Sequence, residues 1–432
     1  MAGWKEGNVA PAKLNATVVV SKFQVQSEPV SPRLVRSLPH PDRTSSISTV
    51  VFNPDGQLIV SGYPSGIVQV LNPATGKELR TIETQRGFRS SLNYLKISKD
   101  FRTLFVSLVN MKAEAVQVGE RKTYYRRYEG ETRVYDLVTG EQKEPLRVEP
   151  RRGVHSLILS PDASRVVSTE STSGRVEDFA KLGATYLWDM ATRQAVKLRD
   201  GYGYSWFSQD GKTVFIFEKD QKDKTGAIYA YSAVDGKELS RQTIADEPGH
   251  WFSHGSDSKG KIASTSVDTK SKKPTIRLYN PDSFELEGVL TADEVEGQSG
   301  FGGKTFSPDN KRLAAVANST VFLWDVESRK LLKSWRLDTL GRIRNLKFDS
   351  KGERLAISTL HLPPELGKIL GETPSALDLP QPKVFLIDVN SDKIETIICP
   401  HGLGNYQAFS PDGRLLAVGG TGATHIFNVE KK

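Results

Sequence analysis

Few residues of this 432-residue chain have types and spacings that could support catalysis. His250 and His254 are four residues apart, which on an extended strand is about 13 Å, too far for one metal ion. The stretch GQSGF at 297–301 lacks the second glycine of a G-x-S-x-G nucleophile motif. The glycine-rich stretch 297–304 does not have the spacing of a phosphate-binding loop. We therefore expect no catalytic residue, no cofactor and no metal site.

A binding chemistry is indicated within residues 109–131, where basic and aromatic residues are interleaved. Arg and Tyr are frequent at protein interface hot spots, and basic residues beside aromatic ones also suit single-stranded nucleic acid. We predict a hairpin in which TYYRRY pairs with MKAEAVQV. The candidate partner-binding residues are Arg121, Lys122, Tyr124, Tyr125, Arg126 and Arg127, together with Lys272 and Lys273 from a similar loop further along the chain.

A repeated unit must position these residues, and its most regular part is a short polar turn. Pro, Asp, Asn and Gly in such a turn favour a tight reversal between antiparallel strands. Eight copies occur: NPDG at 53–56, SKD at 98–100, SPD at 160–162, SQDG at 208–211, DSKG at 257–260, SPDN at 307–310, DSKG at 349–352 and SPDG at 410–413.

Each turn is followed by a short apolar run, then by a β-branched and aromatic strand, a second turn and a more polar strand. Continuous apolar runs such as RLAAVA are typical of strands buried on both faces. Four antiparallel strands per unit at this spacing predict the blade of a β-propeller, an all-β fold.

The repeats resemble those of the WD-repeat family and its bacterial relatives. The residues that carry the resemblance are Trp188-Asp189, Trp324-Asp325 and the F/S-x-P-D-G turns, and it covers residues 33–432. The other copies depart from the Trp-Asp pattern, as Leu71-Asn72, Tyr135-Asp136, Tyr231-Ser232, Tyr279-Asn280, Ile387-Asp388 and Phe427-Asn428. The resemblance implies a ring closed by pairing the two ends of the chain.

The number of strands indicates where the ring closes. Eight units supply the first three strands, but only seven fourth strands follow them. We expect residues 33–38 to complete the last blade, because an open ring would leave an unpaired strand edge. This gives eight blades, or seven if the unit around 257–260 merges with a neighbour. Residues 1–32 form an N-terminal extension with another candidate strand at 14–25, and 33–432 form a single domain.

The insertions fall mainly between second and third strands, and these loops must emerge on one face of the ring. They occupy 109–131, 170–184, 219–226, 268–275 and 360–383. The last is rich in proline and leucine, and it is either a lid or a loop packed on itself. We interpret this face as the recognition surface of a non-catalytic scaffold that binds another protein or a peptide. The alternatives are an enzyme of the quinoprotein or lactonase propeller type and a nucleic-acid-binding platform.

Composition agrees with this interpretation. The chain has 25% charged residues, a net charge of +8 and a pI near 9.2, which is modest for its length. It has one cysteine, Cys399, and we find neither a secretory signal nor a run of about 20 apolar residues. We expect a monomeric cytoplasmic protein that does not associate with membranes.

Overall fold

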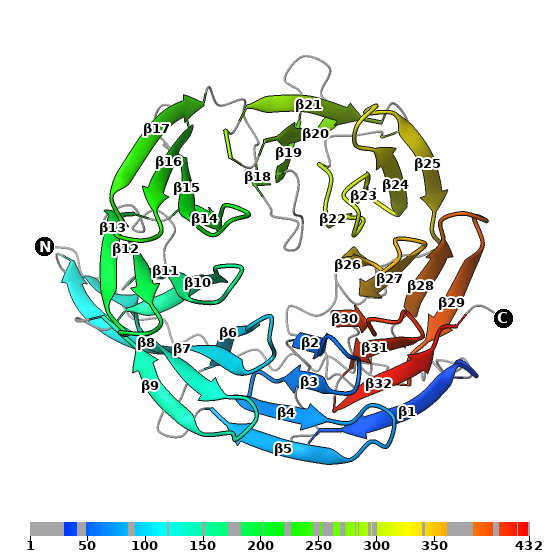
Figure 1. The fold of residues 1–432 in the computed structure, drawn as a ribbon, viewed down its shortest axis with the longest axis horizontal. Helices are drawn as coiled ribbons and strands as arrows, with labels where there is room; N and C mark the ends of the chain where they lie inside the picture. The colour runs from blue at the N-terminus through cyan, green and yellow to red at the C-terminus, as the bar shows by residue number, and fades with distance from the viewer. Residues whose placement is uncertain are drawn as a thin grey trace, which may run out of the picture.

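The fold is known from a computed structural model of the chain. It describes residues 30–40, 49–84, 91–118, 121–148, 152–171, 183–201, 203–219, 226–244, 251–252, 262–267, 273–280, 282–283, 285–292, 295, 300–338, 342–360, 383–400, 406–420 and 422–430. Within these residues, the strands form eight four-stranded antiparallel sheets arranged as blades around one axis (Figure 1). The predicted all-β propeller with eight blades is confirmed.

Each blade runs outward from the axis in chain order, apart from the closing strand. The innermost strands are β2 (Thr49–Phe52), β6 (Ser91–Ile97), β10 (Gly153–Leu159), β14 (Tyr204–Phe207), β18 (Trp251–Phe252), β22 (Lys304–Phe306), β26 (Arg342–Phe348) and β30 (Tyr406–Phe409). The second strands are β3 (Ile59–Gly62), β7 (Thr103–Val118), β11 (Arg165–Ser171), β15 (Thr213–Lys219), β19 (Ile262–Val267), β23 (Arg312–Ala317), β27 (Arg354–Leu360) and β31 (Leu415–Gly419).

The outer half of each blade is built the same way. The third strands are β4 (Ile67–Leu71), β8 (Arg121–Asp136), β12 (Gly183–Asp189), β16 (Gly226–Ser232), β20 (Pro274–Tyr279), β24 (Thr320–Asp325), β28 (Lys383–Asp388) and β32 (Ala423–Asn428). The outermost strands are β5 (Glu78–Glu83), β9 (Gln142–Leu146), β13 (Ala195–Asp200), β17 (Glu238–Ile244), β21 (Leu286–Thr291), β25 (Leu331–Arg336), β29 (Ile394–Ile398) and β1 (Leu34–Pro39).

The polar turn joins the first and second strands as its composition predicts. At the third blade, the Ser160 hydroxyl donates to Asp162 at 2.6 Å and accepts from the Arg165 backbone N–H at 2.9 Å. Ser98, Ser208, Ser307 and Ser410 repeat this arrangement. Where the turn ends in glycine, as at Gly211, that residue has φ = 72°, which glycine adopts without strain. The turn therefore fixes the register of each inner hairpin.

Burial follows the position of a strand in its blade. The second strands are buried on both faces, as β23 is from Leu313 to Ala317, because their two faces pack against neighbouring blades. The outermost strands alternate, and in β25 only Trp335 is fully buried. Burying apolar area between blades is the main force that holds such a ring together.

Basic side chains add specific contacts from one blade to the next. The Arg165 Nε donates to the Ala233 carbonyl at 2.9 Å, and the Arg312 Nη2 donates to the Gly352 carbonyl at 2.8 Å. Arg354 is buried, forms an ion pair with Asp349 at 2.8 Å and donates to carbonyls of the last blade. These contacts fix the spacing between blades because each guanidinium reaches a fixed backbone acceptor.

The two ends of the chain meet in the last blade. Strand β1 pairs antiparallel with β32, with Ser37 opposite His425 and Leu38 opposite Thr424. The Arg33 guanidinium donates to the Asn428 carbonyl at 3.0 Å, and Leu38 is 1% exposed. Closure by the N-terminal strand is therefore confirmed, and the closing strand begins one residue later than predicted.

The unit around 257–260 belongs to a separate blade, β18–β21, so the seven-blade alternative is wrong. The candidate strand at 14–25 lies outside the described residues.

Candidate functional site

Among the described residues, the longest hairpin lies between the second and third strands of the second blade. Strands β7 and β8 stay paired from Thr103 opposite Asp136 to Val118 opposite Arg121. Met111 is opposite Tyr128, so the predicted pairing of MKAEAVQV with TYYRRY is confirmed. Figure 1 shows this hairpin extending past the outline of the ring at the left of the view. We call residues 111–128 the projecting hairpin.

Six of the sequence-predicted site residues lie on the β8 arm of the projecting hairpin. Successive strand residues alternate between the two faces, so Arg121, Tyr125 and Arg127 belong to one face. Lys122, Tyr124 and Arg126 belong to the other face, where the register places Gln117, Ala115 and Ala113 opposite them. Both faces therefore combine basic and aromatic residues.

The other two predicted residues lie elsewhere in the ring. Lys273 immediately precedes β20 in the fifth blade, and Lys272 lies outside the described residues. The third and fourth blades separate the fifth blade from the second (Figure 1). The structure therefore brings the six hairpin residues together and does not bring Lys273 to them.

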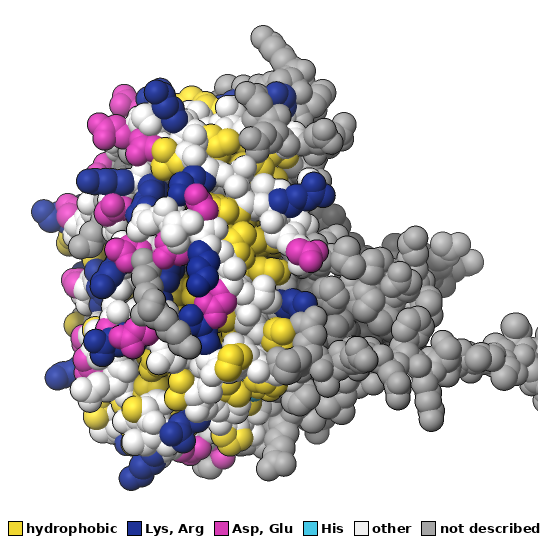
Figure 2. Space-filling view, turned by 90° about the vertical axis from the view of Figure 1, so that its right-hand side faces the viewer, with side chains coloured by type: hydrophobic (Ala, Val, Ile, Leu, Met, Phe, Trp, Pro, Cys, Tyr) yellow, Lys and Arg dark blue, Asp and Glu magenta, His cyan; other side chains and the backbone are white. Residues whose placement is uncertain are grey.

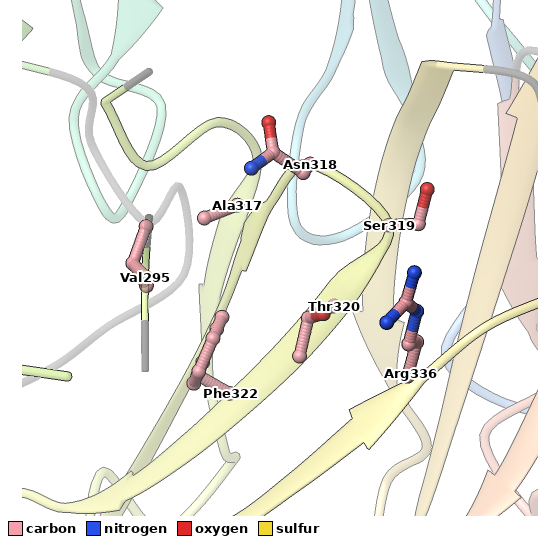
Figure 3. A pocket seen from close by; sticks show the side chains of 7 residues that line it. All are labelled: Val295, Ala317, Asn318, Ser319, Thr320, Phe322 and Arg336. Carbon is pink, nitrogen blue, oxygen red and sulfur yellow. The ribbon is translucent and has the colours of Figure 1, made fainter. Parts of the chain in front are cut away.

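A pocket of about 380 Å³ opens at the short turn between β23 and β24 (Figure 3). Val295, Ala317 and Phe322 supply apolar walls, and the polar lining comes from Asn318, Ser319, Thr320 and Arg336. The turn is held by a hydrogen bond from the Leu337 N–H to the Ser319 carbonyl at 2.8 Å. Asn318 has φ = 54°, a conformation that asparagine tolerates better than most residues. Sequence reasoning missed this pocket because its turn is short and carries no insertion.

The innermost strand of the sixth blade begins with an unusual residue. Lys304 is partly buried and stands three residues before the serine of the polar turn. The equivalent residues in the six other blades for which the structure describes this position are uncharged, namely Val50, Leu95, Leu157, Ser205, Leu346 and Gln407. Burial lowers the pKa of the Lys304 ammonium from 10.5 to about 8, because a poorly solvated site disfavours the charged form. Among the described residues, it has no hydrogen-bond or ion-pair partner.

A buried carboxyl group occupies the third blade. The Ser168 hydroxyl donates to Glu170 at 2.6 Å and accepts from the Trp188 Nε1–H at 2.9 Å. Burial raises the pKa of Glu170 to about 7, although the Ser168 hydrogen bond and the charge of Arg152 oppose this shift. The second Trp-Asp copy differs, since the Trp324 Nε1–H donates to the Thr291 carbonyl at 2.9 Å. These bonds link strands within or between blades, and we interpret them as structural.

Other reactive groups are few in the described part of the chain. It contains no group of three or more His, Cys, Asp or Glu side chains that could hold a metal ion. Burial raises the pKa of the Cys399 thiol to about 12, so the thiol stays protonated and unreactive near neutral pH. No helix in that part is long and apolar enough to span a bilayer.

The geometry defines the class of protein, which is an eight-bladed β-propeller closed by its N-terminal strand. A family model described as "WD domain, G-beta repeat" matches residues 32–71, which include the closing strand and most of the first blade. The solved structure of the C-terminal WD40 domain of Sif2 has 13% sequence identity to this chain and a TM-score of 0.60, over 94% of this chain and 99% of that one. No curated protein sequence matches the chain.

These comparisons agree with the propeller fold and add a likeness to the WD repeat over residues 32–71. At 13% identity, the likeness to the Sif2 domain concerns the fold alone. The comparisons give no support to the narrower resemblance to bacterial relatives.

Proposed function

We propose that this protein is a non-catalytic scaffold that binds another protein through the face carrying its second-to-third-strand loops. The observation that supports this most directly is the projecting hairpin, in which β7 and β8 continue their pairing beyond the blade. Isolated two-stranded ribbons are only marginally stable in water. A hairpin rich in Arg and Tyr that extends from a rigid ring is therefore suited to completing its contacts with a partner.

The ring itself suits such a role. Its blades are fixed by buried strands and by contacts such as the one between Arg312 and Gly352. A rigid platform loses little conformational entropy on association, so more of the contact energy contributes to affinity. We further propose that the protein acts as a monomer in the cytoplasm, in agreement with its single buried cysteine.

A hairpin variant tests this function. Replacing Arg121, Lys122, Arg126 and Arg127 with Ser should leave the melting temperature unchanged, because these residues lie beyond the ring. Affinity purification from the native cell, followed by quantitative mass spectrometry, should then recover the partner at least about tenfold less efficiently, as expected for a loss of about 1.4 kcal/mol.

The matched control replaces four exposed lysines with Ser on the turns at the opposite ends of the strands. They are Lys77, Lys212, Lys237 and Lys330. This variant loses the same number of positive charges and should recover the partner as the unmodified protein does. Equal recovery by the hairpin variant and this control would refute the role of the hairpin.

A further inference from the structure

The pocket beside Asn318 lies on the same face of the ring as the projecting hairpin. It opens at the turn between β23 and β24, and the hairpin joins β7 to β8. Both are connections between a second and a third strand, and the strands of every blade follow the same antiparallel order from the axis outward. The pocket therefore lies on the proposed recognition face.

The floor of the pocket is the edge of the apolar core between the fifth and sixth blades. Val295, Ala317 and Phe322 are buried and belong to the cluster that also contains Leu290 of β21 and Trp324 of β24. Strand β23 ends two residues before the residue that follows its turn into β24 at position 320, so the sixth blade adds no insertion of its own over this edge. The pocket thus offers an apolar surface at its base.

The polar side of the pocket comes from β24 and β25. Thr320 pairs with Arg336 across these two strands, so their side chains lie on one face of the blade. Phe322 lies on the same face, two residues or roughly 7 Å further along β24. Figure 3 shows Val295, Ala317 and Phe322 on one side of the pocket and Arg336 on the other, with Thr320 between them. A cationic group therefore lies a short distance from an apolar surface.

The polar side chains at the mouth of the pocket are available to a ligand. Asn318, Thr320 and Arg336 make no side-chain hydrogen bond or ion pair with the described residues, and Asn318 and Arg336 are exposed. Among the described residues that line the pocket, Arg336 is the only charged one. Its planar guanidinium can donate two parallel hydrogen bonds to a carboxylate. The chemistry that fits is therefore a carboxylate attached to an apolar group.

We propose that this pocket binds the C-terminal residue of a partner protein in which that residue has an apolar side chain such as Leu or Phe. This inference rests on the proposed function, because it assigns a segment of the partner to the same face. A C-terminal residue carries its side chain and its carboxylate on one Cα, so the two groups reach the floor and Arg336 together. The volume of about 380 Å³ is at the lower end of the range for ligand pockets, and the buried floor suits a chain that ends there instead of passing through.

The surrounding charge does not favour a polyanion. Figure 2 shows Lys and Arg side chains intermixed with Asp and Glu over the side of the ring that carries β25 and β29. A nucleic acid is bound by a row of basic side chains along its phosphates, whereas the described lining of the pocket supplies one guanidinium. One guanidinium matches the single charge of a carboxylate.

Fluorescence anisotropy with a labelled Gly-Ser peptide that ends in Leu tests the proposal. The free acid is compared with the C-terminal amide, which lacks the negative charge, and with the same peptide ending in Gly. We expect the amide and the Gly peptide each to bind at least about tenfold more weakly than the Leu acid. The proposal is wrong if the acid and the amide bind equally, or if the Leu acid shows no saturable binding up to about 10 mM.

A protein variant tests the role of the guanidinium. Arg336→Gln should lower the affinity for the Leu acid at least about tenfold and leave the affinity for the amide unchanged. Arg414→Gln, at an exposed turn at the opposite ends of the strands, is the matched control and should bind both peptides as the unmodified protein does. Equal affinities of the two variants for the Leu acid would overturn the proposal. An amidated peptide with an internal Leu-Asp pair that binds more tightly than the Leu acid would also overturn it, in favour of an internal acidic segment.

The two proposals fail separately. The hairpin variant should bind the Leu acid as the unmodified protein does, because the projecting hairpin belongs to the second blade. If the hairpin variant captures the cellular partner as its lysine control does, while Arg336→Gln loses the Leu acid, the role of the hairpin fails and the C-terminal site stands.

Discussion

The innermost and outermost strands of each blade belong to the same repeat unit, but their basic side chains differ in whether they are paired. At the rim, basic residues meet acids or carbonyls of neighbouring blades, as Arg33 does with Glu395, Arg199 with Glu218 and Lys333 with Asp392. At the axis, Lys304 and Lys347 have no such partner among the described residues. Rim charges therefore contribute to assembly of the ring, whereas Lys304 and Lys347 on the innermost strands do not pair with the described residues.

The largest expected effect comes from removing a rim strand. Deleting residues 34–39 removes β1, exposes the edge of β32 and uncovers the cluster around Leu38. We expect loss of the single cooperative transition in thermal unfolding, measured by circular dichroism, because the eighth blade no longer closes the ring. An unchanged melting curve would show that rim pairing is not what completes the fold.

The second effect concerns a basic residue that has partners. In the ion pair of Arg354 with Asp349, the side chains are 10% and 1% exposed. Arg354→Ala leaves the carboxylate of Asp349 buried without its partner, and we expect a loss of about 3–5 kcal/mol in the free energy of unfolding. Arg414→Ala, at a pair whose side chains are 67% and 58% exposed, is the control and should cost less than about 1 kcal/mol. Equal costs in urea denaturation would contradict the structural role given to paired charges.

The difference between rim and axis also separates what the sequence predicts from what it does not. The turns at Ser160 and its equivalents and the strand order within each blade follow from local patterns, because turn chemistry and alternation are properties of adjacent residues. The closing strand follows from the count of strands over the whole chain. The projecting hairpin was predictable for the same reason, since TYYRRY and MKAEAVQV lie close together in the chain.

The poorly solvated lysine of β22 was not predictable in this way. The burial of Lys304 depends on packing around the strand, and KTF in β22 carries no distinctive pattern. The pocket beside Asn318 likewise combines Val295 of one connection with Arg336 at the end of another strand. Contacts between blades are set by register and by packing across the blades, which single-sequence patterns do not encode.

The smallest expected effect measures the cost of leaving an axial charge unpaired. The pKa of Lys304 is lowered from 10.5 to about 8. Burial of the charged amine therefore costs stability in full below pH 8, and this cost disappears as the pH rises to 10.5. Lys304→Met removes this cost, and we expect it to raise the free energy of unfolding by about 1–3 kcal/mol at pH 7. The gain should shrink as the pH is raised toward 10, which urea denaturation at several pH values can measure. A variant that is less stable at pH 7, or a gain that does not change with pH, would mean that Lys304 is paired in the free protein.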